Sequence, residues 1–181
     1  MDNDHVAPVL VLGVGNTLLG DDGVGVHLLE QLSRVADDRD GAVEFIEGGT
    51  RGLALLGSIA GRAGLVLLDA VALGSVPGTI YLRRDEDVLA LRRRAETAHE
   101  SNAGELLATA QLLGDLPKHV FLVGIEPARL GSGLGLSEPV RKAIPAALGA
   151  ARFALSQALA YQPALPPLFP SVQTAGSLCN T

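Results

Sequence analysis

The chain has 181 residues, of which 48% are hydrophobic and 19% charged, so it carries enough apolar side chains for one folded domain. Its formal net charge of −6 and its 3% of aromatic residues argue against a protein that binds nucleic acid through phosphates or stacked bases. The only cysteine, Cys179, excludes an intrachain disulfide and a zinc site built from cysteines.

The first half of the chain is predicted to alternate strands and helices. Val9–Val14 is an apolar run typical of a strand buried on both faces, and Gly23–Arg34 repeats apolar residues at helical spacing. A second strand is predicted at Val43–Glu47 and a short helix at Leu53–Ala60.

The second half continues the same alternation. Gly64–Leu68 and Val120–Gly124 are further apolar strands, and Asn102–Leu113 between them has an amphipathic helical pattern. Thr79–Arg83 follows a Pro-Gly pair and is predicted to be an antiparallel strand at the sheet edge. A long Ala-rich helix is predicted over Ser137–Tyr161.

Two residues of the long helix carry separate predictions. Ser137 is expected to cap its N-terminus, because a serine oxygen there can accept a hydrogen bond from a free backbone N–H group. Pro145 is expected to kink or split the helix, because proline lacks a backbone N–H group.

The order of elements predicts an α/β fold, a three-layer α/β/α sandwich around a sheet of about five mostly parallel strands. We expect an N-terminal arm at 1–7, one domain at 8–161 and a proline-rich, poorly ordered tail at 162–181. No segment reaches the ~18 uncharged apolar residues of a membrane helix, and the first residues are acidic, so we expect a cytoplasmic protein that does not bind a membrane. A monomer is our default expectation.

Residues 13–25 form a glycine-rich loop between the first strand and the first helix. Gly13 and Gly15 fit the dinucleotide fingerprint G-x-G-x-x-G, but Leu18 stands where the third glycine belongs. Asp21 and Asp22 then place two carboxylates where a pyrophosphate would bind. Helix capping explains one aspartate more readily than two.

Two other residues join Asp22 as candidates. Asp69 ends a buried strand at the edge where this fold class binds ligands, although it could instead turn the chain or cap the next helix. His99 precedes the helix at 102–113, and a lone loop histidine is more often a solvated surface residue. Together, two carboxylates and one imidazole would suit a divalent transition metal such as nickel or zinc.

The chain resembles the hydrogenase maturation proteases, endopeptidases that trim the C-terminus of the [NiFe]-hydrogenase large subunit. The resemblance runs in unbroken order over about residues 8–160. It is carried by five stretches: Gly13-Val14-Gly15-Asn16 with Leu18 and Asp21-Asp22-Gly23-Val24-Gly25; Glu47-Gly48-Gly49-Thr50; Leu67-Leu68-Asp69-Ala70 with Pro77-Gly78; Thr97-Ala98-His99; and Leu122-Val123-Gly124-Ile125-Glu126-Pro127.

The resemblance implies which residues form the site and what they bind. The family's metal ligands fall on Asp22, Asp69 and His99, and these are also the expected catalytic residues of an aspartyl-type endopeptidase. The metal would be nickel supplied by the large-subunit precursor, with no organic cofactor. The exposed loop Gly48-Gly49-Thr50 is expected to hold the substrate backbone.

Other interpretations stay open at this point. The chain carries no Gly-x-Ser-x-Gly elbow and no His-Glu-x-x-His helix, so a water molecule activated by the metal or a carboxylate is the expected nucleophile. The alternatives are a nickel-handling chaperone that binds the precursor without cutting it, and a nucleotide-dependent enzyme on a similar sheet.

Overall fold

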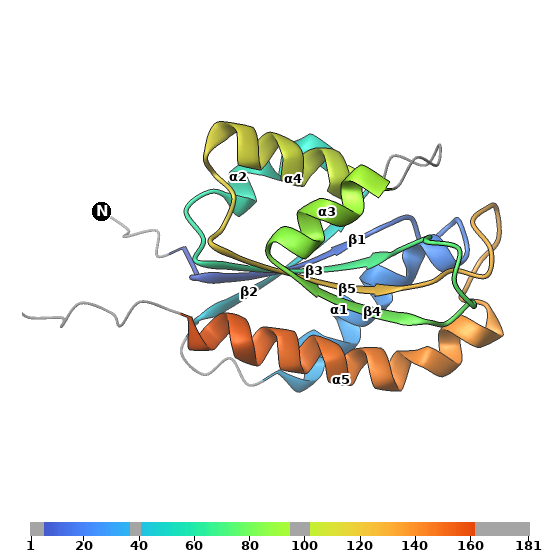
Figure 1. Ribbon diagram of the computed structural model, residues 1–181. Coiled ribbons are helices and arrows are strands. Elements are labelled where there is room, and N and C mark those ends of the chain that lie inside the picture. Colours follow the sequence, from blue (N-terminus) through green and yellow to red (C-terminus); the bar gives the residue numbers. More distant parts are fainter. Residues whose placement is uncertain (1–5, 37–40, 95–101, 162–181) are drawn as a thin grey trace, which may run out of the picture.

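The computed structural model describes residues 6–36, 41–94 and 102–161 (Figure 1). Five strands form one sheet in the order β2-β1-β3-β5-β4. The pairs β1–β2, β1–β3 and β3–β5 are parallel, and only β4 runs antiparallel to its neighbour β5. This confirms the predicted α/β class and the antiparallel edge strand. The strands are β1 (Val9–Val14), β2 (Val43–Gly49), β3 (Gly64–Ala70), β4 (Ile80–Arg84) and β5 (His119–Ile125).

Helices cover both faces of the sheet, as Figure 1 shows. On one face, α1 (Val24–Val35) and α5 (Glu138–Ala160) pack against a cluster that includes Val11 and Val66. On the other face, Leu10 and Leu67 pack against the remaining helices. These are the short 3-10 helix η2 (Gly52–Leu55), α2 (Leu56–Ile59), α3 (Glu86–Arg94) and α4 (Asn102–Leu113). Successive strand residues therefore point into opposite cores, which explains the continuous apolar runs.

The sequence did not predict α3. Its segment is rich in charge, and its residues Glu86 and Asp87 lie in the first turn, where a helix favours acidic side chains. Val88 is only 2% exposed and packs into the core cluster of the α4 face. Tertiary contacts of a few apolar residues stabilise this helix. So few apolar positions in a stretch this short do not form a recognisable helical period in the sequence.

The long helix α5 runs unbroken through Pro145, so the expected split does not occur. Pro145 lies on the exposed side of the helix, where water can bind the carbonyl that proline leaves without a donor. Ser137 occupies the predicted N-cap position, but its side chain makes no capping hydrogen bond. By length and composition α5 could cross a membrane. One face of α5 instead packs into the core of the domain. The buried residues of this face are Val140, Ile144, Ala147, Ala151, Ala154, Leu155 and Ala158.

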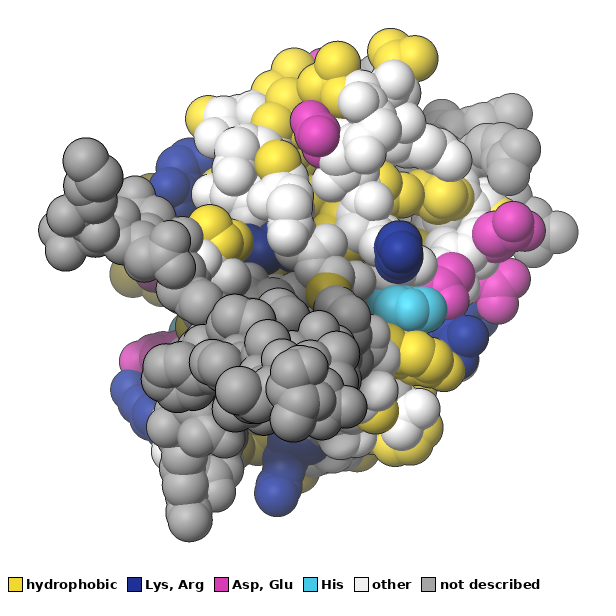
Figure 2. Space-filling view, turned by 90° about the vertical axis from the view of Figure 1, so that its left-hand side faces the viewer, with side chains coloured by type: hydrophobic (Ala, Val, Ile, Leu, Met, Phe, Trp, Pro, Cys, Tyr) yellow, Lys and Arg dark blue, Asp and Glu magenta, His cyan; other side chains and the backbone are white. Residues whose placement is uncertain are grey.

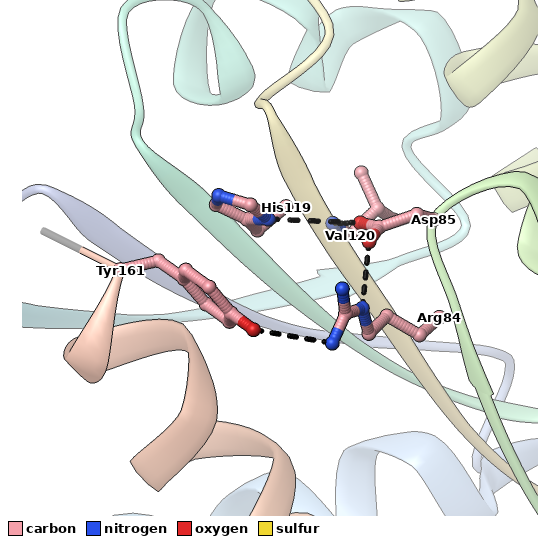
Figure 3. Close-up of polar contacts among 5 residues, drawn as sticks. All are labelled: Arg84, Asp85, His119, Val120 and Tyr161. Carbon is pink, nitrogen blue, oxygen red and sulfur yellow. Dashed lines mark hydrogen bonds and ion pairs between the residues drawn. The ribbon is translucent and has the colours of Figure 1, made fainter.

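A polar cluster fastens β4, β5 and α5 together where β5 begins (Figure 3). The carboxylate of Asp85 accepts a hydrogen bond from the Val120 N–H group at 2.9 Å and one from Arg84 at 2.7 Å. Arg84 also contacts the hydroxyl group of Tyr161 at 3.2 Å, and the Tyr161 ring stacks on His119. These contacts hold the end of the sheet at which β5 begins, opposite to the carboxyl ends of the parallel strands.

Candidate active site

The strand order creates a topological switch point between β1 and β3. The chain leaves β1 through α1 on one face to reach β2, then returns through η2 and α2 on the other face to reach β3. The connections therefore diverge at the carboxyl ends of β1 and β3, the place where doubly wound sheets bind ligands. Asp22 follows β1, and Asp69 lies near the end of β3.

The loop after β1 is folded tightly enough to carry Asp22 over the end of the strand. At Gly15, where φ is 113°, an added Cβ atom would lie 1.8 Å from the carbonyl oxygen of Asp22. Only glycine lets the backbone at residue 15 come this close to the backbone of Asp22. The loop can therefore turn back on itself before the helix begins. The Oδ2 atom of Asp22 accepts a hydrogen bond from the Asn16 N–H group at 2.6 Å, which holds the carboxylate beside the strand end.

Asp69 is a buried carboxyl group. Its side chain is only 6% exposed, and its Oδ1 atom accepts a hydrogen bond from the Ala70 N–H group at 2.8 Å. Burial raises the pKa of Asp69 to about 8; the Ala70 N–H group opposes the rise and the nearby charge of Asp22 adds to it. Asp69 therefore carries a proton at neutral pH unless a cation replaces it.

Asp22 and Asp69 line the same cavity, which has a volume of about 300 Å³. From the two carboxyl groups, the cavity extends into the space between the sheet and the helices α3 and α4. Its wall there is apolar and includes Val88, Leu91 and Leu107. A pair of carboxyl groups at one end of an apolar cavity can bind a cation or exchange protons with a bound substrate.

The three residues of the predicted loop Gly48-Gly49-Thr50 lie in two different environments. Gly49 and Thr50 line the cavity, whereas Gly48 is buried against β1. A Cβ atom at Gly48 would come within 2.9 Å of the Leu12 side chain, so glycine keeps β2 close to β1 at this point.

His99 lies outside the described residues, so the structure does not place the third predicted ligand. Among residues 6–36, 41–94 and 102–161, no group of three or more His, Cys, Asp and Glu side chains is arranged to hold a metal ion. The described part of the chain thus contributes two carboxyl groups, Asp22 and Asp69, to the predicted set of three.

Asp21 has a structural role that its sequence position does not reveal. Its buried carboxylate accepts hydrogen bonds from the backbone N–H groups of Ala128, Arg129 and Ser137. Burial alone would raise the pKa of Asp21, but these hydrogen bonds outweigh it and lower the pKa below its ordinary value. Asp21 therefore ties the β1–α1 loop to the β5–α5 loop, and the two adjacent aspartates have different tasks.

Glu126 is another buried carboxylate, and its place in one of the five matched stretches did not predict its role. It accepts hydrogen bonds from the N–H groups of Leu73 and Gly74 and from the hydroxyl group of Tyr81. Burial would raise the pKa of Glu126, yet these donors lower it. Since Leu73 lines the cavity, Glu126 fixes one part of the cavity wall. Its partners lie more than 40 residues away in sequence, and no local pattern indicates them.

Comparison with known proteins decides the family. The family model for hydrogenase maturation proteases matches residues 26–152. The hydrogenase 2 maturation protease of Escherichia coli strain K12 is 38% identical over 143 residues, which cover 77% of this chain and 85% of that protein. The chain belongs to the hydrogenase maturation protease family.

Further relatives and solved structures agree with this assignment. The hydrogenase expression/formation protein HupD of Rhodobacter capsulatus is 35% identical over 152 residues, covering 83% of this chain and 69% of that protein. The solved structure of the hydrogenase maturating endopeptidase HybD from E. coli has a TM-score of 0.73 and 37% identity, and the match covers 82% and 92% of the two chains. The hydrogenase 2 maturation peptidase from a Thaumarchaeota archaeon has a TM-score of 0.62 and 34% identity, covering 82% and 97%.

These relatives confirm two predictions made from the sequence. The motif resemblance to the hydrogenase maturation proteases is correct, and the chain is a peptidase. They also confirm the fold, because the HybD structure matches this chain over 82% of its length with a TM-score of 0.73.

Proposed function

We propose that this peptidase removes the C-terminal extension of a nickel-loaded [NiFe]-hydrogenase large-subunit precursor, with the nickel of the substrate as the recognition element. The observation that carries the proposal is the meeting of Asp22 and Asp69 on one cavity at the switch point of the sheet. Membership of the hydrogenase maturation protease family supports the choice of substrate.

In this proposal Asp22, Asp69 and His99 bind the nickel that arrives with the precursor. Carboxylate oxygens and an imidazole nitrogen suit this ion, and a set of three protein ligands leaves coordination positions for the ligands of the substrate. Because an uncompensated charge is costly inside the cavity, the buried Asp69 holds either a proton or a cation, and nickel that binds there displaces the proton. The enzyme then needs no organic cofactor and no resident metal.

The same residues are proposed to assist cleavage. A water molecule attacks the scissile carbonyl carbon and gives a proton to a site carboxylate, and the carbon–nitrogen bond breaks as the leaving amine takes up a proton. Because Asp69 has exchanged its proton for the nickel at this stage, the carboxylate that takes the proton from water is also the group that returns it to the leaving amine. Gly49 and Thr50, which line the cavity, would align the substrate backbone beside the site carboxylates, and Gly48 would hold this strand end close to β1.

The test is the mass of the large subunit after incubation with the enzyme. Wild-type enzyme should release a C-terminal fragment from nickel-loaded precursor and none from the nickel-free form. The variants Asp22→Asn, Asp69→Asn and His99→Ala should each lower the rate by about a hundredfold or more. Glu30→Gln is the control, because Glu30 is exposed on α1 and pairs with Arg34 one turn along the same helix.

Three outcomes would contradict parts of the proposal. Full activity of both Asp69→Asn and His99→Ala would refute the assigned site. Cleavage of nickel-free precursor at the same rate would refute recognition through nickel. Complex formation with an unchanged mass would indicate a chaperone that binds the precursor. We further propose that the enzyme acts in the cytoplasm and that it is a monomer. Sedimentation of the purified chain tests the oligomeric state.

A further inference from the structure

Four exposed leucines lie in the two loops that contribute Leu19 and Leu130 to the cavity wall. Leu18 and Leu19 lie in the β1–α1 loop, and their side chains are 63% and 37% exposed. Leu130 and Leu134 lie in the β5–α5 loop and are 37% and 79% exposed. We call these four residues the leucine rim. Both loops lie at the right-hand edge of the molecule in Figure 1, where the parallel strands end.

The leucine rim is continuous with the site. Leu19 and Leu130 line the cavity that holds Asp22 and Asp69, and Leu18 and Leu134 are their exposed neighbours beside the backbone hydrogen bond that joins Leu18 to Gly133. A polypeptide with one segment inside the cavity would therefore meet these leucines as it leaves. Exposed apolar side chains grouped beside a cavity mark an interaction surface more often than isolated ones do.

The two loops that carry the rim are fastened to each other. The N–H group of Gly20 donates to the carbonyl oxygen of Gly133 at 2.8 Å, and the Gly133 N–H group donates to Leu18 at 3.2 Å. Asp21 adds its three hydrogen bonds to the backbone of the β5–α5 loop. The leucines are thus presented on a fixed platform, which lowers the entropy cost of binding a partner.

We propose that the leucine rim is a docking surface for an apolar segment of the folded precursor, next to the part that enters the cavity. The inference rests on the proposed function, because the partner is the protein that the peptidase cuts. Its continuity with the cavity favours the substrate over any other occupant. Binding at the rim adds affinity outside the reacting groups, so it selects the whole precursor rather than a short peptide sequence.

The experiment uses the full chain and two matched double variants. In the test variant, Leu18→Gln and Leu134→Gln keep the side-chain size and remove its apolar character. In the control variant, Leu112→Gln and Leu113→Gln change two leucines at the end of α4 that are 86% and 59% exposed. Figure 2 looks onto the side of the molecule opposite to the cavity mouth, and hydrophobic side chains gather at its top over the helix layer that includes α4.

The readouts are the Kd of the nickel-loaded precursor and the kinetics of its cleavage. The test variant should raise the Kd and the KM by about tenfold and leave kcat unchanged, whereas the control variant should match the wild type. Equal thermal unfolding of the three proteins checks that both variants fold. If wild-type enzyme binds the precursor without cutting it, the cleavage proposal fails, and a selective loss of binding in the test variant still supports the rim.

Other results would overturn the inference. Unchanged Kd and KM in the test variant, or an equal change in the control variant, would show that the rim does not contact the precursor. A wild-type dimer that the test variant dissociates, without a change in precursor affinity, would assign the rim to a second copy of this chain. Absence of any binding by the wild type would refute the rim and the proposed function together.

Discussion

Gly25 shows how a single residue determines the distance between a helix and the sheet. It lies in the first turn of α1, and an added Cβ atom would meet the carbonyl oxygen of Leu68 at 2.2 Å and that of Val14 at 2.4 Å. Backbone atoms of β1 and β3 cannot move aside as a flexible side chain would. The start of α1 therefore packs directly on both strand ends, beside the two aspartates of the candidate site.

Replacing Gly25 with alanine should consequently destabilise the protein. We expect the free energy of unfolding to fall by about 2 kcal/mol or more, because the methyl group must displace backbone. Gly149→Ala is the matched control: Gly149 is also helical, and a Cβ atom there meets nothing within 4 Å. That variant should be neutral or stabilised by up to about 1 kcal/mol. Urea unfolding of both variants measures the difference, and equal losses would contradict the packing argument.

At the residue scale, sequence reasoning found acidic residues in conspicuous places and missed the tasks of those with distant partners. Asp69 was identified because it ends an apolar run, and Asp22 because two adjacent aspartates stand in a glycine-rich loop. The task of Asp21 was not, because its hydrogen-bond partners lie more than 100 residues further along the chain. Only the folded backbone shows that Asp21 binds a loop while Asp22 faces the cavity.

At the element scale, the cavity depends on connections that are held by buried carboxylates. Asp21 fixes the β5–α5 loop, and Glu126 fixes the segment that follows β3 through Leu73 and Gly74. The strands themselves were predicted to within one or two residues, because their apolar runs are unambiguous. The loops were not predicted, since their shape is set by these long-range hydrogen bonds.

Asp21→Ala should therefore loosen one loop and destabilise the whole domain. Three backbone N–H groups would lose a charged acceptor in a buried place, so we expect the free energy of unfolding to fall by about 3 kcal/mol. The exposed Asp115→Ala serves as control and should change stability by less than about 0.5 kcal/mol. Amide hydrogen exchange at Ala128, Arg129 and Ser137 should accelerate in the Asp21 variant. Unchanged exchange there would argue against the assigned role.

At the scale of the whole molecule, the buried carboxyl groups give stability an unusual dependence on pH. The pKa values of Asp21 and Glu126 are lowered on folding, so the stability that they contribute is present above their ordinary values and is lost as the pH falls through the folded ones. The pKa of Asp69 is raised to about 8. Between its ordinary value of 3.8 and about 8, the folded state holds a proton that the unfolded state has released, so stability falls as the pH rises.

Comparison of wild type with Asp69→Asn isolates the second effect. Asparagine cannot ionise, so the stability difference in favour of the variant should be smallest near pH 4 and should grow up to about pH 8. Urea unfolding between pH 4 and pH 9, without added metal, measures it. A difference that stays constant over this range would show that Asp69 is not protonated in the folded state at neutral pH.

The overall architecture was the most predictable level. Alternating strands and helices with continuous apolar runs determine the layers, and Pro77-Gly78 before Ile80 marked the strand that reverses direction. The order of the strands was beyond sequence reasoning, because it depends on which helix packs on which face. That order places the carboxyl ends of β1 and β3 side by side, and so brings together Asp22 and Asp69.

The antiparallel strand β4 has a consequence for how the protein behaves in a crowded solution. It is the last strand of the sheet, and no strand of the described residues pairs with the outer row of its main-chain amide and carbonyl groups. Arg83 and Arg84 stand at the end of this strand, and a foreign strand that paired alongside would have to bring apolar residues next to two guanidinium ions. Positive charge at an open edge discourages such growth into aggregates, and here it does so at the edge of the sheet far from β2.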